Sequence, residues 1–163
     1  MSEKKKVYVE TTVVSDATAL PTNDLALAGR QITTRKWWST AAERFELYCS
    51  DIVKREALRG DPDAARRRIA ALSQISELQT SAQALGLAAK LIEGKAVPKE
   101  YPDDALHIAI AAVCEMDFLV SWNFKHITNA QTIPLVKRIC GDNGFICAEI
   151  CTPYQLQAEG GAA

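Results

Sequence analysis

The chain lacks several features that would decide its class at once. Its formal net charge is only −1, so a nucleic-acid partner would be held by local basic patches rather than by overall charge. Its glycines are scattered and form no phosphate-binding loop, which argues against a nucleotide cofactor. The longest apolar run, residues 105–114, is far shorter than the roughly 20 residues that cross a bilayer. We therefore expect a globular protein with no membrane partner.

Cysteine chemistry is also sparse. The five cysteines are an odd number, and no two have the Cys-x-x-Cys spacing of many zinc and redox sites. This pattern argues against a disulfide framework and indicates a reducing compartment, so we expect a cytoplasmic protein. With 163 residues, 48% of them hydrophobic, the chain suits one domain with a sizeable core.

Short apolar runs alternate with helical patterns along the chain. Strands are predicted at VYVE, LYCS, SELQTS, DFLVSW and FICAEI. Helices are predicted at about 25–47, 51–60, 62–75, 81–95, 103–116 and 134–140. This alternation predicts an α/β fold with a mostly parallel central sheet flanked by helices. We expect one domain over residues 1–163, with a core at about 7–156 and a frayed C-terminal tail.

Four sets of polar residues stand at places where parallel-sheet proteins build sites, just beyond strand ends or in early helix turns. Glu10 follows the strand VYV, and Asn123 follows FLVSW. Glu56 lies on the helix at 51–60, and the pair Asp103 and Asp104 opens a later helix. Each alone suits a cap, a turn or a solvated helix face. Their common placement indicates a site.

Clustered carboxylates favour a bound cation. Two of them about 4 Å apart repel by about 4 kcal/mol at an effective dielectric constant of about 20. Mg²⁺ or Mn²⁺ removes this repulsion, prefers oxygen ligands and often binds substrate phosphates as well. Such a site suits phosphodiester hydrolysis, because the metal generates a hydroxide and stabilises charge on the phosphoryl oxygens.

Four stretches of the chain together resemble the acidic motifs of PIN domains: VYVETTVVSD, SDIVKREALRGDPDAARRR, DALHIAIA and DFLVSWNFKHI. They are most similar to PIN-domain nucleases related to the VapC-type toxins of bacterial toxin–antitoxin pairs. The order and spacing extend from about Val7 to Leu156, and ICTPYQL resembles the closing strand and turn of the family. The resemblance implies a PIN-like three-layer fold, dependence on Mg²⁺ or Mn²⁺, and cleavage of single-stranded RNA.

The resemblance also implies residue roles. It gives metal binding to Glu10, Glu56 and Asp104, and it places Asn123 at the fourth catalytic position. There are two departures, because the family usually has aspartate at the first position and often at the fourth. Asparagine offers a neutral oxygen and removes one negative charge, which argues against a second metal.

Residues beside these positions are candidates for substrate contact. Thr12 and Ser121 match the small hydroxyl residues that lie beside the acids in such proteins. Trp122 could stack on bases, and Lys125 could contribute to a local basic surface. His107 lies three residues after Asp104, either as a general base or as a satisfied group packed near the core.

The sequence thus predicts a metal-dependent endoribonuclease that acts on single-stranded RNA. The resemblance further suggests a homodimer and, for a toxin, a small antitoxin that occupies the site. Two other classes stay open. One is a PIN-fold module that binds RNA or a protein without cutting, which Asn123 favours. The other is a small-molecule phosphodiesterase or phosphatase, which the modest basic charge permits.

Overall fold

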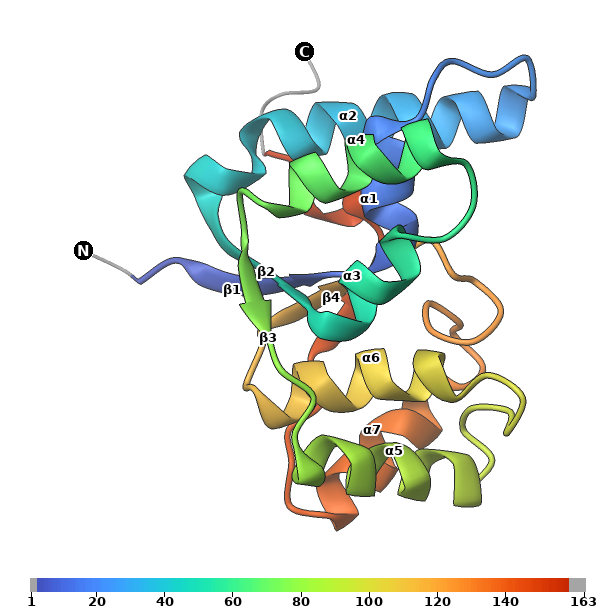
Figure 1. Ribbon diagram of the computed structural model, residues 1–163. Helices are drawn as coiled ribbons and strands as arrows, with labels where there is room; N and C mark the ends of the chain where they lie inside the picture. The colour runs from blue at the N-terminus through green and yellow to red at the C-terminus, as the bar shows by residue number, and fades with distance from the viewer. Residues whose placement is uncertain (1–2, 159–163) are drawn as a thin grey trace.

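The computed structural model describes residues 3–158 and shows one parallel sheet between two layers of helices (Figure 1). The strands are β1 Lys5–Val9, β2 Phe45–Ser50, β3 Ser76–Leu78, β4 Phe118–Val120 and β5 Glu149–Cys151. The helices are α1 Thr11–Thr18, α2 Leu25–Arg44, α3 Asp51–Ala57, α4 Pro62–Leu72, α5 Ala82–Glu93, α6 Pro102–Val113 and α7 Ile133–Asp142, followed by the 3₁₀ helix η1 Pro153–Leu156. In Figure 1, α1, α2 and α4 lie on one side of the sheet and α5, α6 and α7 on the other.

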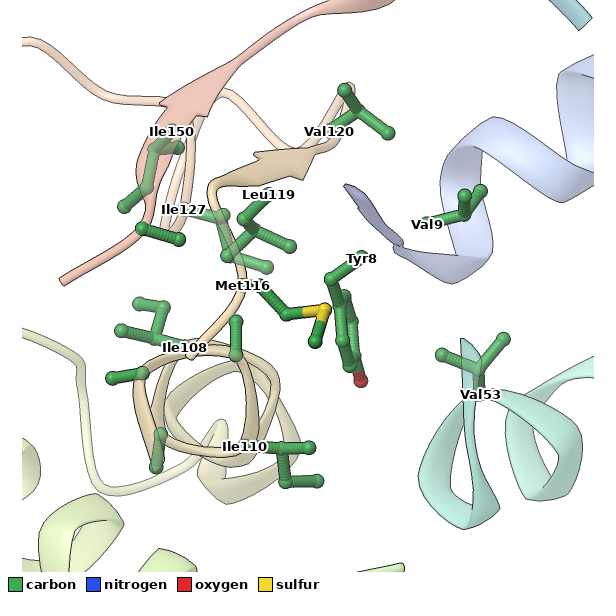
Figure 2. Close-up of a cluster of buried hydrophobic side chains, with 14 of the residues drawn as sticks. Tyr8, Val9, Val53, Ile108, Ile110, Met116, Leu119, Val120, Ile127 and Ile150 are labelled. Atoms are coloured by element: carbon green, nitrogen blue, oxygen red, sulfur yellow. The ribbon is translucent and has the colours of Figure 1, made fainter. Parts of the chain in front are cut away.

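The sheet has the strand order β3-β2-β1-β4-β5, and every neighbouring pair is parallel. β1 is central, and its residues Val7, Tyr8 and Val9 have no exposed surface. A parallel strand covered on both faces reads as a continuous apolar run, as VYV does. Figure 2 shows the core beside it, where side chains from β1, β4, α3 and α6 gather. The predicted α/β fold with a parallel central sheet is confirmed.

The helix boundaries follow ordinary capping chemistry. The Ser50 hydroxyl accepts a hydrogen bond from the Val53 amide at the start of α3. Asp61 caps α4 in the same way, and Pro62 takes the first helical position. Such caps satisfy amide groups that have no partner inside the helix, so they define where a helix begins.

Several predicted boundaries were wrong. The strand SELQTS ends at Leu78, and the helices predicted to end at residues 60, 75 and 116 end at Ala57, Leu72 and Val113. The helix predicted at 25–47 ends at Arg44, because residues 45–47 pair with Lys5–Val7 as the start of β2. The strand predicted at FICAEI is confined to Glu149–Cys151. The preceding residues instead close α7, where Gly144 has a φ of +84° and the Phe145 amide bonds the Cys140 carbonyl. Residues 157 and 158 of the predicted frayed tail have no regular structure, and residues 159–163 lie outside the described range.

The carboxyl ends of the strands meet at one edge of the sheet. From β1 the chain continues to β2 and β3 on one side of the sheet, and it then returns to β4 and β5 on the other side of β1. Ligand sites of parallel sheets form at such a switch point. The Glu10 amide extends the β1–β4 ladder by a 3.1 Å bond to the Val120 carbonyl. The pairing of β1 with β4 therefore places Glu10 next to the residues that follow β4. Within residues 3–158, no helix has the length and apolar character to cross a membrane.

Candidate metal and active site

A pocket of about 280 Å³ opens at this edge of the sheet. It brings together the four predicted catalytic residues, which come from the junction of β1 and α1, from α3, from α6 and from the loop after β4. We call it the acidic pocket. Its lining consists of Glu10, Thr11, Thr12, Ser15, Asp16, Arg30, Glu56, Asp104 and Asn123.

Glu10 is held in place through one of its two carboxylate oxygens. Its Oε1 accepts hydrogen bonds from the Thr12 amide at 3.2 Å, from the Thr12 hydroxyl, and from the Ser121 hydroxyl at 2.6 Å. Among residues 3–158, no donor reaches Oε2. The carboxylate is therefore oriented by one oxygen, while the other remains available to a ligand.

The two hydroxyls are themselves oriented by the backbone. Thr12 Oγ1 accepts the Trp122 N–H at 2.8 Å, and Ser121 Oγ accepts the Asn123 N–H at 2.9 Å. Because each hydroxyl oxygen accepts a backbone hydrogen, its own hydrogen is directed to Glu10. Ser121 has no exposed surface. The structure thus places Ser121 behind Glu10, where it contacts that carboxylate and not the open pocket.

Burial raises the pKa of Glu10, since its carboxylate is almost entirely removed from water. The charge of His107 and the hydrogen bonds from Ser121 and Thr12 act in the opposite direction and are outweighed. The nearby charge of Glu56 adds to the increase. A cation in the pocket would favour the ionised form of Glu10 and so would compete with the proton for this carboxylate.

Glu56 is held from behind by α1 and α6. Its Oε1 accepts hydrogen bonds from the Thr11 hydroxyl at 2.7 Å and from His107 Nε2 at 2.6 Å. Burial alone would raise the pKa of Glu56, but the bond to His107, its charge and the bond to Thr11 more than offset this and lower it. Glu56 is therefore the more readily ionised of the two glutamates.

A buried chain of hydrogen bonds fixes His107 and, through it, Glu56. His107 Nδ1 lies 2.7 Å from the Tyr8 hydroxyl, which lies 2.7 Å from Ser50 Oγ. Because the ionised Glu56 carboxylate can only accept, Nε2 carries the hydrogen of this bond and donates it to Glu56. His107 has no exposed surface and both ring nitrogens are bonded. Of the two possibilities for His107, the structure supports the satisfied core group.

The charge of His107 is favoured by its surroundings. Burial lowers the pKa of His107. The hydrogen bond to Glu56 and the negative charges of Glu10, Glu56 and Asp104 raise this pKa by more than burial lowers it, so the net shift is upward. Protonation of His107 would partly neutralise the clustered carboxylates.

Asp104 is oriented by the loop on the far side of the pocket. Its Oδ2 lies 2.9 Å from His126 Nδ1, and the His126 ring stacks on Tyr101 with 4.2 Å between centroids. The His126 amide in turn donates to Asn123 Oδ1 at 3.0 Å. One histidine therefore ties together the third carboxylate and the amide at the fourth position.

The neighbouring aspartate has a different role. Neither aspartate caps α6, because the N-cap position is Tyr101 and no side chain caps this helix. Asp103 instead forms ion pairs with Arg55 at 2.6 Å and Arg59 at 3.8 Å. Of the two aspartates, only Asp104 lines the acidic pocket.

The donor atoms suit a hard divalent cation. Potential ligand atoms of Glu10, Glu56 and His107 lie within 4.8 Å of one another. Asp104 lines the same pocket but lies outside this group of three. Because both nitrogens of His107 are bonded and the ring is fully buried, we assign ligation to the carboxylate oxygens. Three carboxylates with an asparagine oxygen nearby form an oxygen-rich set of the kind that Mg²⁺ and Mn²⁺ prefer.

Two charged residues of the pocket were missed in the sequence. Asp16 lies four residues after Thr12 on α1, and this spacing could have placed it on the same helix face. Arg30 comes from α2 and reaches the pocket only because α2 packs on α1. Its Nε donates to Asp16 Oδ2 at 3.0 Å, and its guanidinium lies 5.4 Å from the centre of the Trp122 ring.

Of the two other predicted substrate contacts, Trp122 is buried and Lys125 is exposed. Trp122 is only 8% exposed, and its indole N–H donates to the Thr34 hydroxyl at 2.8 Å. Lys125 is exposed on the loop after β4 but does not line the acidic pocket.

No protein-family model and no curated protein sequence matches this chain. Solved structures do match it. One is VapBC2 from Rickettsia felis bound to a DNA fragment from their promoter, with a TM-score of 0.51 and 16% identity over 74% of this chain and 89% of that chain. Another is VapC20 from Mycobacterium tuberculosis, a toxin that cleaves the sarcin–ricin loop, with a TM-score of 0.50 and 14% identity over 86% of this chain and 96% of that chain. At such identities the similarity is one of fold, so the predicted PIN-like, VapC-like fold is confirmed.

Proposed function

We propose that this protein is an endoribonuclease that hydrolyses phosphodiester bonds of single-stranded RNA with Mg²⁺ or Mn²⁺. One observation carries the proposal. Glu10, Glu56 and Asp104 come from three separate elements, line one pocket, and are each held through a single oxygen. Among the described residues, their second oxygens, Oε2, Oε2 and Oδ1, have no hydrogen-bond partner. This arrangement is suited to holding a cation against a phosphate.

In this proposal each residue has a defined task. The free oxygens of Glu10, Glu56 and Asp104 hold the metal ion. When bound, that ion supplies Lewis acidity toward the phosphate and a water of lowered pKa. Thr12 and Ser121 keep Glu10 oriented, so we reassign these two residues from substrate contact to positioning.

The opposite side of the pocket also has assigned tasks. Asn123 is a weaker contributor to metal binding, because its side-chain oxygen already accepts the His126 amide. This favours one metal ion. Lys125, exposed on the same loop, is a proposed contact for the RNA backbone.

The occupied oxygen of Asn123 also supports a second candidate, a PIN-fold module that binds RNA without cutting it. In that case the three carboxylates would still bind metal, but turnover would be absent. Cleavage and metal binding must therefore be measured separately.

The proposal is tested with purified protein, single-stranded RNA and added Mn²⁺. We expect metal-dependent cleavage, and we expect Asp104→Asn and Glu10→Gln each to lower its rate by at least about 100-fold, because even residues that only orient metal ligands are worth about 10–100-fold. Asp103→Asn is the matched control, since it changes the neighbouring carboxylate outside the pocket and is expected to retain activity.

The absence of metal-dependent cleavage by the parent protein, or equal cleavage by the Asp104→Asn variant, would refute the nuclease. Metal binding measured by calorimetry without cleavage would favour the binding module.

We further propose, from the likeness in fold to VapC structures, that the protein is the toxin of a toxin–antitoxin pair and acts in the cytoplasm as a homodimer. Induced expression in a bacterial host is then expected to stop growth, and Asp104→Asn is expected to relieve the arrest. Sedimentation velocity of the purified protein tests the dimer. Unimpaired growth with full-length protein present in the cells would contradict the toxin.

A further inference from the structure

A second hollow, of about 520 Å³, adjoins the acidic pocket. It lies between α2, the loop after β4, the start of α7, β5 and η1. Its walls are largely apolar and aromatic. We call it the aromatic pocket, and the residues that matter here are Arg30, Trp122, Phe124, Ile133, Ile150 and Tyr154.

The two pockets are continuous. Arg30 lines both of them. Asn123 lines the acidic pocket, while its two sequence neighbours, Trp122 and Phe124, line the aromatic one. Since these three residues are consecutive, the aromatic pocket begins within one residue of the proposed catalytic position.

The aromatic side chains are available to a ligand. Phe124 is 52% exposed and Tyr154 is 68% exposed, so both rings stand at the surface with no core to fill. Phe124 meets Trp122 edge to face, with 6.0 Å between ring centroids. Rings presented in this way are the usual means by which proteins stack on unpaired bases.

A cation lies where the two pockets meet. Arg30 donates to Asp16 through Nε, and among residues 3–158 its two terminal nitrogens have no acceptor. Its side chain is about one-third exposed. A guanidinium with free donors is a strong partner for a phosphate.

We propose that the aromatic pocket binds a nucleobase of the RNA substrate, next to the phosphodiester bond that lies over the acidic pocket, and that Arg30 meets the phosphate between them. The position relative to the bond rests on the proposed nuclease function; the binding of a base does not. The occupant is a base and not a second copy of the chain, because the hollow has the volume of a small-ligand site, about 300–1,000 Å³, and a cation at its mouth.

The indole signals of the three tryptophans give a direct test in the metal-free protein. Trp122 is in the aromatic pocket, and Trp37 and Trp38 serve as internal references. The probes are the four nucleoside 5′-monophosphates and ribose 5-phosphate, which lacks a base. We expect at least one nucleotide to shift the Trp122 indole signal in ¹H–¹⁵N spectra. Ribose 5-phosphate can reach only Arg30, which lies 5.4 Å from the centre of the Trp122 ring, so we expect it to shift this signal much less.

Substitutions locate the binding. Phe124→Ala is expected to raise the Kd of the bound nucleotide about tenfold, since stacking on one base is worth about 1–3 kcal/mol and about 1.4 kcal/mol is tenfold. Leu85→Ala is the control, because Leu85 is 55% exposed on α5, away from the pocket. The Kd of the Leu85→Ala variant for the nucleotide is expected to equal that of the parent protein.

Three results would overturn the proposal: no nucleotide shifts Trp122, ribose 5-phosphate shifts it equally, or Phe124→Ala binds as the parent does. A Phe124→Ala variant that loses self-association without any nucleotide effect would mark an interface between copies instead. RNA cleavage without nucleotide binding would remove only this inference, whereas nucleotide binding without cleavage would support it and remove the nuclease.

Discussion

The two sides of the acidic pocket are built differently. Glu10 and Glu56 are held from the core, by hydroxyls and by the fully buried His107. Asp104 and Asn123 are held by the loop after β4, through His126, whose side chain is 16% exposed and whose ring packs on the half-exposed Tyr101. The hydrogen bonds on the core side connect the site to the packed interior, whereas those on the loop side connect it to the loop after β4. We therefore expect removal of His107 and removal of His126 to have different effects on stability and on metal affinity.

The largest expected effect is on the core side. His107→Ala removes the partner of Glu56 and of the Tyr8 hydroxyl and leaves both groups buried without it. Breaking a buried charged pair in this way costs about 3–5 kcal/mol, and we expect that loss in the free energy of unfolding measured with urea.

Tyr8→Phe sharpens this prediction. It keeps the aromatic ring in the core and removes only the hydroxyl that bonds His107 and Ser50, so we expect a loss of about 1–3 kcal/mol. A His107→Ala variant as stable as the parent protein would show that the hydrogen-bonded chain does not hold the core side together.

A smaller effect on stability is expected on the loop side. His126→Ala frees Asp104 and Asn123 while leaving the core intact, so the free energy of unfolding should change little. Metal affinity should fall by about 10–100-fold, as for other partners that orient metal ligands. Calorimetric titration with Mn²⁺ measures this, with Lys125→Ala on the same loop as the control. A large loss of stability in His126→Ala would remove the contrast between the two sides.

The smallest expected effect has the opposite sign. The pKa of Glu10 is raised on folding, so the carboxyl binds its proton more tightly in the folded protein than in the unfolded chain. Its contribution to stability is present below the unfolded pKa and is lost as pH rises through the folded pKa. At pH 7 without metal, Glu10→Gln is therefore expected to stabilise the protein, by about 0.5–2 kcal/mol, as relief of a functional constraint commonly does.

With metal present, we expect the parent protein to be more stable than Glu10→Gln. Mn²⁺ should raise the melting temperature of the parent protein and not that of Glu10→Gln, because only the parent keeps the full set of charged ligands. Melting curves at pH 4 and pH 7, with and without Mn²⁺, measure both effects. A stabilisation of Glu10→Gln that is as large at pH 4 as at pH 7 would contradict the assignment to ionised Glu10.

Much of the fold was predictable because its signals are local. VYV and FLV are unbroken apolar runs, and Ser50 and Asp61 are good caps, so strands and helix starts could be located. The end of α2 could not be located, because residues 45–47 continue the series of bulky apolar residues and become a strand only by pairing with β1. FICAEI failed for a similar reason, since only its end reaches β4.

The site shows the same division. Glu10 and Asn123 could be placed by their positions after strands, since the carboxyl ends of parallel strands meet at one edge of the sheet. Which of two adjacent aspartates enters the pocket could not be decided, because that choice depends on arginines from α3 that pair with Asp103. Nor could the sequence place Arg30, which is brought to the pocket by packing between two helices.

The sequence alone therefore determined the α/β class and most of the order of the elements, because periodicity, capping and residue type act over a few neighbouring positions. Tertiary structure alone decided the roles. It turned His107 into a buried support for Glu56, Ser121 into a support for Glu10, and Arg30 into a cation shared by two pockets. Hydrogen bonds and ion pairs between distant segments depend on three-dimensional proximity, which emerges only when the helices pack on the sheet.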